Sequence, residues 1–261
     1  MTTRVVIAGG GGRMGRALTE HVRDSSDFVL HGVLLSDDAA APVLAGVPAD
    51  IYRRDLDGLA GADVFIDFTA PSAVAAHADV CVAGGIAWVL GTTGLDAAQQ
   101  ELVTGAARDV PVCQAANFST GVNLMLRLAA LAAGAVDDET DLEVIEAHHR
   151  HKVDAPSGTA LALGRVLADA RGVDLDSSAV MSRVGITGAR PAGAIGFSAI
   201  RGGDIVGEHT VLLAGDGEQL EIRHRAGTRL AFARGACRAA AWLAQQPPGL
   251  YDMQDVLRLR S

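Results

Sequence analysis

The chain has 261 residues, of which 49% are hydrophobic, so it can bury a full core and is not a disordered polymer. Its formal net charge of −9 and its aromatic content of only 4% argue against a nucleic acid or an anionic membrane as partner. The three cysteines are isolated and odd in number, which favours the reducing cytoplasm over a disulfide framework.

Residues 4–8 form an apolar run close to the N-terminus, so we expect a strand there and no signal peptide. No apolar stretch reaches the roughly 20 residues that a membrane-spanning helix needs. Similar apolar runs predict further strands at 28–35, 64–68, 86–90 and 111–115, with helices at 13–24, 72–83 and 96–108. Alternation of this kind predicts a doubly wound parallel sheet of the Rossmann type.

The pattern changes after about residue 120, where a second α+β domain with a more antiparallel sheet is expected. Its predicted elements are helices at 121–134 and 159–170, a strand at 141–147, and a hairpin of 205–213 with 219–224. The hairpin should turn at the run Gly-Asp-Gly (residues 215–217). A final helix at 229–244 suits packing against the first domain, so we expect one domain from 1–119 plus 229–261 and another from 120–228.

The run Gly-Gly-Gly-Gly-Arg-Met-Gly (residues 9–15) satisfies the dinucleotide-binding pattern G-x-G-x-x-G. It follows an expected strand and opens an expected helix, so a pyrophosphate could approach backbone N–H groups with no side chain in between. A glycine-rich turn without a ligand is the plainer alternative, which the flanking strand and helix disfavour.

The end of the second strand should read the adenosine ribose. Asp37 is the candidate, and an aspartate there favours NAD, whereas Ser36 with Arg13 or Arg16 could contact the 2′-phosphate of NADP. The choice between NADH and NADPH stays open. The runs Gly-Thr-Thr-Gly (91–94) and Ala-Ala-Asn-Phe (115–118) suit a nicotinamide–ribose site, with ordinary turns as the alternative.

A run of charge, Glu-Ala-His-His-Arg-His-Lys (146–152), precedes Asp-Ala-Pro-Ser-Gly-Thr (154–159) at the start of an expected helix. Lys152, the Thr159 hydroxyl and the helix N–H groups could hold a carboxylate, and a histidine can transfer protons at neutral pH. A metal site is disfavoured because His148 and His149, adjacent on a strand, point to opposite faces. A solvated basic edge remains the plain alternative.

The whole run from 146 to 160 closely resembles the signature of the dihydrodipicolinate reductase family. Other segments resemble that family in the same order, namely 9–15, 64–69, 91–94, 115–119, 201–210 and 250–257. The resemblance implies a reductase that uses NADH or NADPH on a small cyclic dicarboxylate, 4-hydroxy-tetrahydrodipicolinate, in diaminopimelate and lysine biosynthesis. It also implies a homotetramer built through the open sheet of the second domain.

By the same resemblance, His148 is the acid/base residue and Lys152 the proton donor, while His149, Gly158 and Thr159 contact substrate. The implied cofactor contacts are Gly9, Gly10, Gly11, Gly12, Arg13, Met14, Gly91, Thr92, Thr93, Ala115, Ala116, Asn117 and Phe118. No basic residue adjoins Ser36 and Asp37, whereas some family members carry an acidic–basic pair there. The alternatives are another two-domain dehydrogenase, acting on aspartate or a sugar, and an NAD(H)-binding redox sensor without turnover.

Overall fold

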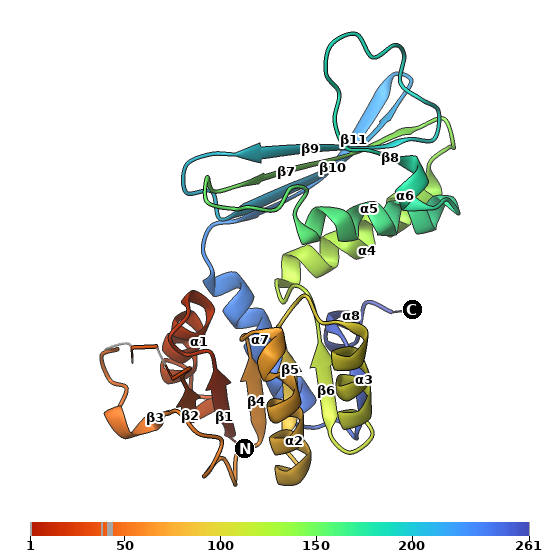
Figure 1. Cartoon of the computed structure of the whole chain (residues 1–261). Coiled ribbons are helices and arrows are strands. Elements are labelled where there is room, and N and C mark those ends of the chain that lie inside the picture. The colour runs from red at the N-terminus through yellow and green to blue at the C-terminus, as the bar shows by residue number, and fades with distance from the viewer. Residues whose placement is uncertain (1, 38, 41–43, 261) are drawn as a thin grey trace. The chain divides into compact units, whose positions relative to one another are not determined.

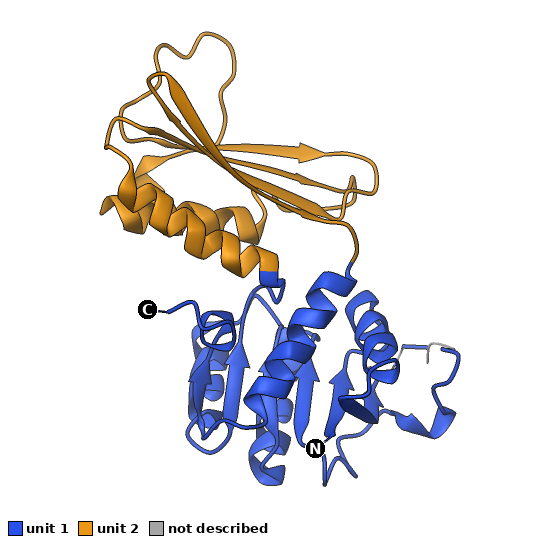
Figure 2. Cartoon of the chain, turned by 180° about the vertical axis from the view of Figure 1, so that it is seen from behind, with its two compact units in different colours: residues 1–120, 229–261 blue, residues 121–228 orange. Residues whose placement is uncertain are grey.

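A computed structural model describes residues 2–37, 39–40 and 44–260 of the chain. The chain forms two compact units, Met1–Thr120 with Arg229–Ser261 and Gly121–Thr228, which Figure 2 shows in two colours. The first unit is therefore built from both ends of the chain, and the second unit is one continuous stretch. No helix within the described ranges is both long and apolar enough to cross a membrane.

The first unit contains a seven-stranded sheet in the order β12-β6-β5-β4-β1-β2-β3 (Figure 1). All of its strand pairs are parallel. The strands are β1 (Thr3–Ala8), β2 (Phe28–Leu34), β3 (Tyr52–Arg53), β4 (Val64–Asp67), β5 (Ala87–Leu90), β6 (Pro111–Gln114) and β12 (Gly249–Tyr251). This arrangement confirms the predicted doubly wound parallel sheet.

Helices cover both faces of this sheet. They are α1 (Arg13–Arg23), α2 (Val74–Gly84), α3 (Ala97–Ala106), α7 (Leu230–Leu243) and α8 (Met253–Val256), with 3₁₀ turns η1 (Ala49–Ile51) and η2 (Pro71–Ala73). On β1, Val5 and Ile7 share a core with α1 and α7, whereas Val6 and Ala8 share one with α2 and α3. The run is continuously apolar because both faces of the strand are buried.

The second unit contains a mixed five-stranded sheet in the order β11-β10-β7-β9-β8. Its strands are β7 (Asp141–His148), β8 (Ala179–Val180), β9 (Ile195–Arg201), β10 (Gly207–Gly215) and β11 (Glu218–Ala226). The pairs of β10 with β7 and β11 are antiparallel, and those of β9 with β7 and β8 are parallel. Helices α4 (Thr120–Ala135) and α5 (Gly158–Arg171) pack on one face, and the short α6 (Leu175–Ser178) follows α5.

The hairpin turns between Gly215 and Glu218, as predicted, and Gly217 takes a positive φ of 86° there. Next to the turn, β10 ends at Gly215 where 213 was expected, and β11 begins at Glu218 where 219 was expected. Strand β9 was not predicted, because its run contains Gly196 and Ser198 and follows a long glycine-rich segment. Its partner β7 lies about 50 residues earlier in the chain, so no local pattern announces the pairing.

Candidate functional site

The glycine loop joins β1 to α1 in the first unit. Gly9 takes a positive φ of 79°, and a Cβ on Gly15 would lie only 2.2 Å from the carbonyl oxygen of Gly9. Gly12 caps α1 without a side-chain hydrogen bond, and no acidic residue stands in the first turn. The first N–H groups of α1 therefore meet no anionic side chain of their own, which suits a phosphate ligand.

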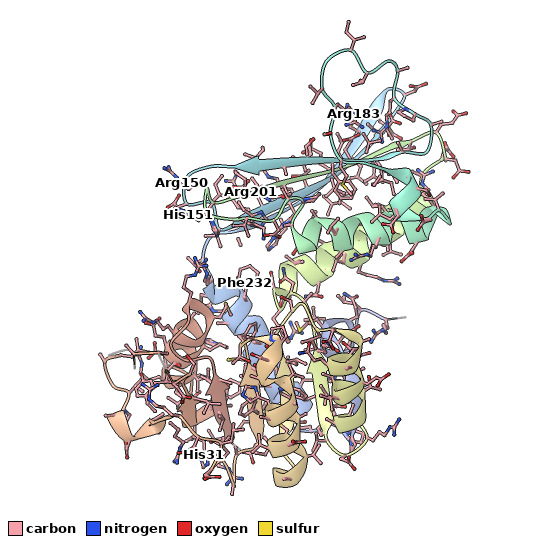
Figure 3. The ribbon with its side chains drawn as sticks, in the orientation of Figure 1. His31, Arg150, His151, Arg183, Arg201 and Phe232 are labelled. Carbon is pink, nitrogen blue, oxygen red and sulfur yellow. The ribbon has the colours of Figure 1, made fainter. Side chains whose placement is uncertain are left out.

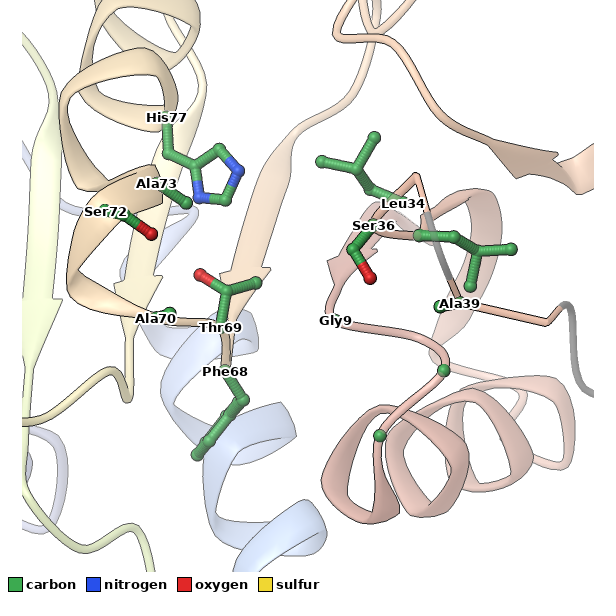
Figure 4. Close-up of a pocket in the computed structure, with 13 residues that line it drawn as sticks. Gly9, Leu34, Ser36, Ala39, Phe68, Thr69, Ala70, Ser72, Ala73 and His77 are labelled. Atoms are coloured by element: carbon green, nitrogen blue, oxygen red, sulfur yellow. The ribbon is translucent and has the colours of Figure 1, made fainter.

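A cavity of about 430 Å³ lies beside this loop (Figure 4). Its walls are the loop itself, the end of β2 and the segment after β4, residues 68–73. Ser36 lines the cavity, whereas Asp37 is exposed and is not among the lining residues. Arg54 donates to the carbonyl oxygens of Ser36, Asp37 and Ala39, so its guanidinium fixes the backbone of the segment that follows β2.

The other predicted cofactor residues follow β5 and β6. A Cβ on Gly91 would lie 2.3 Å from the ring of Phe68, so any other residue there would displace that ring. Thr92 is buried, and its Oγ1 accepts a hydrogen bond from the Thr69 N–H at 3.1 Å, whereas Thr93 is exposed. Phe118 is buried edge-on against Phe68, with ring centroids 5.5 Å apart.

Parallel strands place these segments at one edge of the sheet, because β1, β4, β5 and β6 all end there. Ala115 and Asn117 are half-buried and Ala116 is exposed, immediately after β6. Gly10 and Gly11 are tightly packed against Val33 and Ala39 respectively. Arg13 is exposed and Met14 packs partly against the core of the first unit.

The second unit holds a buried carboxylate, Glu146, with a side chain only 1% exposed. Both terminal nitrogens of Arg201 donate to it, each at 2.7 Å, and the Ser157 N–H donates to Oε1 at 3.1 Å. Nδ1 of His148 lies 2.6 Å from Oε2. Burial raises the pKa of Glu146, but the hydrogen bonds from Arg201 and His148 outweigh burial, so the pKa lies below its ordinary value.

Glu146 fixes the orientation of His148. An ionised carboxylate can only accept hydrogen bonds, so Nδ1 of His148 carries the hydrogen and Nε2 is left to act on a ligand. The two residues stand two apart on β7, which places them on the same face of the strand. Arg201 reaches the pair because it stands opposite His148 in the register of β9.

A second buried pair, Ser157 and His209, lies next to this group. Ser157 Oγ lies 3.1 Å from His209 Nε2 and also accepts the Ala160 N–H, which caps α5. The rings of His148 and His209 meet edge-on with centroids 5.2 Å apart. Burial, with a smaller contribution from His148, lowers the pKa of His209 to about 4, so this ring is neutral at neutral pH.

The remaining predicted residues follow β7. Lys152 Nζ lies 2.8 Å from Asp154 Oδ1, and this hydrogen bond lowers the pKa of Asp154. Gly158 and Thr159 open α5, directly after the capping serine. His149 is half-buried, and its ring centroid lies 6.3 Å from that of His151.

Figure 3 shows Arg150, His151 and Arg201 at the same end of the second unit's sheet. Arg150 and His151 are exposed, and we assign their side chains no role. Among the described residues, no group of three or more histidine, cysteine, aspartate and glutamate side chains is arranged to hold a metal ion.

Sequence reasoning brought His148, Lys152, Gly158 and Thr159 to one strand end and one helix start. The structure places His148 at the end of β7, Lys152 in the segment that follows, and Gly158 and Thr159 at the start of α5. It assigned no role to four residues that orient them, namely Glu146, Ser157, Arg201 and His209. The spacing of Glu146 and His148 on one strand could have revealed the first. Arg201 and His209 come from neighbouring strands, and only the register of the sheet brings them in.

Comparison with known proteins gives the family. Two family models match, described as dihydrodipicolinate reductase, N-terminus, over residues 3–118, and dihydrodipicolinate reductase, C-terminus, over residues 121–257. This chain belongs to the dihydrodipicolinate reductase family. The C-terminal model spans the whole second unit and also α7 and α8, which pack in the first unit.

Relatives in the dihydrodipicolinate reductase family match along their full length. A 4-hydroxy-tetrahydrodipicolinate reductase of Saccharophagus degradans is 50% identical over 268 residues, covering 100% of both chains. One of Alkalilimnicola ehrlichii is 53% identical over 275 residues, covering 99% of this chain and 100% of the other. A dipicolinate-bound dihydrodipicolinate reductase from Paenisporosarcina sp. TG-14 has a TM-score of 0.76 at 27% identity, covering 98% and 99% of the two chains.

Proposed function

We propose that this chain reduces 4-hydroxy-tetrahydrodipicolinate to tetrahydrodipicolinate with NADH or NADPH and loss of water, in diaminopimelate and lysine biosynthesis. The observation that carries the proposal is the open space at Gly158, the first residue of α5. This residue follows His148 and Lys152 in the chain. Within the described part of the chain, a Cβ on Gly158 would meet nothing within 4 Å, and its φ is not positive. The fold does not require glycine there, so the open space is available to a ligand.

The start of α5 suits a substrate carboxylate. The N–H groups of Gly158 and Thr159 belong to the first turn of a 14-residue helix, whose dipole favours an anion. Lys152 adds a positive charge in a chain whose net charge is −9. His149 supplies a further substrate contact in this proposal.

The proton comes from His148 or Lys152. When bound, the reduced nicotinamide supplies a hydride to C4 of the substrate, and the hydroxyl on that carbon leaves as water. One NAD(P)H and one proton are consumed for each water released. Because Glu146 holds Nδ1, His148 would donate the proton from Nε2 in its imidazolium form, whereas Lys152 would donate from Nζ.

The glycine loop and the cavity beside it support a dinucleotide in the first unit. The uncapped start of α1 fits the pyrophosphate, and the cavity of about 430 Å³ gives room for the adenosine end. We propose that both NADH and NADPH are used, with Ser36 or Asp37 reading the ribose. The Thr-Thr pair after Gly91 and the segment 115–118 then contact the nicotinamide half.

The assembly proposed for this chain is a homotetramer formed through the second unit. The face of its sheet that lacks helices carries Ile200, which is 53% exposed, and the loop before β9 carries the fully exposed Ile186. Burial of such side chains favours association. We place the reaction in the cytoplasm, since Cys81, Cys113 and Cys237 are all free thiols.

A coupled assay tests the function. NADH absorbance should fall when the purified protein receives freshly made dihydrodipicolinate synthase product, and should stay constant with aspartate or sugar substrates. Dipicolinate, the ligand in the Paenisporosarcina structure, should compete with that substrate. NADH binding without turnover on any dicarboxylate would instead favour a regulatory redox sensor, and turnover of aspartate or a sugar would favour another dehydrogenase.

A further inference from the structure

A second buried carboxylate, Asp67, ends β4 beside the cavity of the first unit. Its side chain is fully buried. Oδ1 accepts three hydrogen bonds, from the Thr69 N–H at 3.1 Å, the Thr69 hydroxyl at 2.6 Å and the Thr92 hydroxyl at 3.2 Å. Oδ2 faces away from these donors and lies 2.7 Å from Nδ1 of His77. The two oxygens of Asp67 therefore have separate partners.

His77 connects this carboxylate with the cavity. It stands on α2, is 4% exposed and is one of the residues that line the cavity. Its ring packs against Phe65, with centroids 5.0 Å apart. Figure 4 shows the imidazole directed from α2 into the space between Thr69 and Leu34. Within the described residues Asp67 is its one polar partner.

The bond to Asp67 determines what the other nitrogen can do. A carboxylate only accepts, so Nδ1 donates, and a neutral imidazole then has a lone pair and no hydrogen at Nε2. Such an Nε2 accepts a hydrogen bond from an N–H or O–H group of a ligand and rejects a carbonyl oxygen.

The rest of the cavity wall suits a flat base. Leu34, Leu35, Ala39, Ala70 and Ala73 give it a largely apolar lining. In a sheet of this type, the end of the second strand and the glycine loop bind the adenosine half of a dinucleotide. The ribose hydroxyls would bind at the end of β2. A polar group that projects from α2 would therefore face the adenine base.

We propose that His77 recognises the adenine of the cofactor, with Nε2 accepting a hydrogen bond from the 6-amino group, and that Asp67 is the positioning residue that keeps Nε2 an acceptor. This inference rests on the proposed use of a nicotinamide dinucleotide. It adds a specificity device for the base that is independent of the ribose contact at Ser36 or Asp37.

Two substitutions test whether His77 contacts the ligand or only supports the fold. His77→Asn places an amide N–H near the position of Nδ1, keeps the bond to Asp67 and has no atom at the position of Nε2. His77→Gln reaches the position of Nε2 with an amide oxygen that can accept from the amino group. We expect His77→Asn to weaken NADH binding about fivefold, the loss of one hydrogen bond, and His77→Gln to restore part of it.

Asp67→Asn gives the opposite test. The three donors from Thr69 and Thr92 hold the carbonyl oxygen of the new amide in the place of Oδ1, so its N–H₂ group must face Nδ1 of His77. The imidazole then carries its hydrogen on Nε2 and becomes a donor toward the base. We expect this variant to prefer reduced nicotinamide hypoxanthine dinucleotide, whose base has a carbonyl in place of the 6-amino group, whereas the wild type should prefer NADH about tenfold.

The experiment measures fluorescence Kd values for NADH and the hypoxanthine analogue with the wild type and the three variants, with circular dichroism of each. Equal Kd values for both dinucleotides in the wild type, or NADH binding by His77→Asn at wild-type strength, would overturn the inference. A wild-type protein that does not bind NADH at all would overturn the proposed function instead. An unchanged base preference in a folded Asp67→Asn variant would refute the positioning role.

Discussion

At the residue scale, Lys152 and its exposed neighbour Arg150 provide a matched pair. If Lys152 donates the proton and binds the carboxylate, Lys152→Ala should lower kcat about 100-fold or more, within the range of general acid catalysis. The glycine loop is untouched, so the Kd for NADH should stay the same. Arg150→Ala removes an equal charge two residues away and should change kcat less than twofold. Near-normal turnover in Lys152→Ala would remove this residue from the mechanism.

In the proposed mechanism Glu146 acts through His148, so its removal should affect chemistry and stability together. Glu146→Gln leaves two of the four N–H donors facing an amide N–H₂, and we expect kcat to fall at least tenfold and stability to fall by about 3 kcal/mol. Glu143→Gln is the control, because Glu143 stands on the same strand and also pairs with arginine, in its case Arg183 and Arg190. It should leave kcat unchanged.

The lowered pKa of Glu146 gives that stability a pH dependence. A carboxyl whose pKa is lower in the folded state stabilises the protein above its unfolded pKa of about 4.3, and this stabilisation is lost as the pH falls through the folded value. The difference in unfolding free energy between wild type and Glu146→Gln should therefore be constant near neutral pH and shrink below about pH 4. Urea unfolding at several pH values measures it, and a difference independent of pH would contradict the assignment.

The lowered pKa of His209 predicts a second loss of stability on acidification, at a higher pH than the loss due to Glu146. The unfolded chain takes up a proton at about pH 6.5, whereas the folded ring resists protonation down to about pH 4, so stability is lost as the pH falls between these values. The wild type should lose about 2 kcal/mol more than His209→Gln between pH 7.5 and pH 5. Parallel stability curves for the two proteins would show that burial does not keep this imidazole neutral.

At the scale of single elements, a substitution at the start of α5 should affect ligand binding and stability in opposite directions. Gly158→Ala should raise the free energy of unfolding by up to about 1 kcal/mol, since alanine favours a helix and the new Cβ meets no neighbour. The same Cβ should occupy the space that we propose for the substrate carboxylate and raise the KM about tenfold. Gly105→Ala, at an equally open position in α3, should stabilise similarly and leave the KM unchanged. Equal KM values in both variants would mean that no ligand approaches Gly158.

Elements with a local signal were predictable from sequence, and elements that depend on distant partners were not. The glycine loop fixes β1 and α1 because Gly9 takes a positive φ and Gly15 packs against the backbone of Gly9 and Gly10, two demands that arise within the loop itself. Gly217 likewise fixes the hairpin turn. In contrast, β9 depends on pairing with β7, and the contact of Arg201 with Glu146 follows from that pairing. Glu146 stands opposite His209 and His148 opposite Arg201, a register that no local pattern contains.

At the scale of the whole molecule, the first unit needs both ends of the chain. Its core under α1 includes Cys237 and Leu243 from α7, and Met253 from α8, all nearly or fully buried. Each large apolar side chain contributes about 1.5–3 kcal/mol when buried, so losing this set would remove a large part of the total stability of about 5–15 kcal/mol expected of a domain. The C-terminal segment is therefore part of the proposed cofactor-binding unit.

Two truncations test that dependence. A chain that stops at residue 228 should lose NADH binding, and Cys113, whose pKa burial raises to about 12, should become reactive toward a thiol reagent. A chain that stops at residue 257 loses the ion pairs of Arg260 with Asp252 and Asp255, worth less than about 1 kcal/mol each, and two backbone hydrogen bonds, and should bind NADH normally. Normal NADH affinity in the shorter chain would show that the first 120 residues form a complete domain by themselves. Loss of binding in the longer chain would instead assign the last four residues a role that their surface ion pairs do not explain.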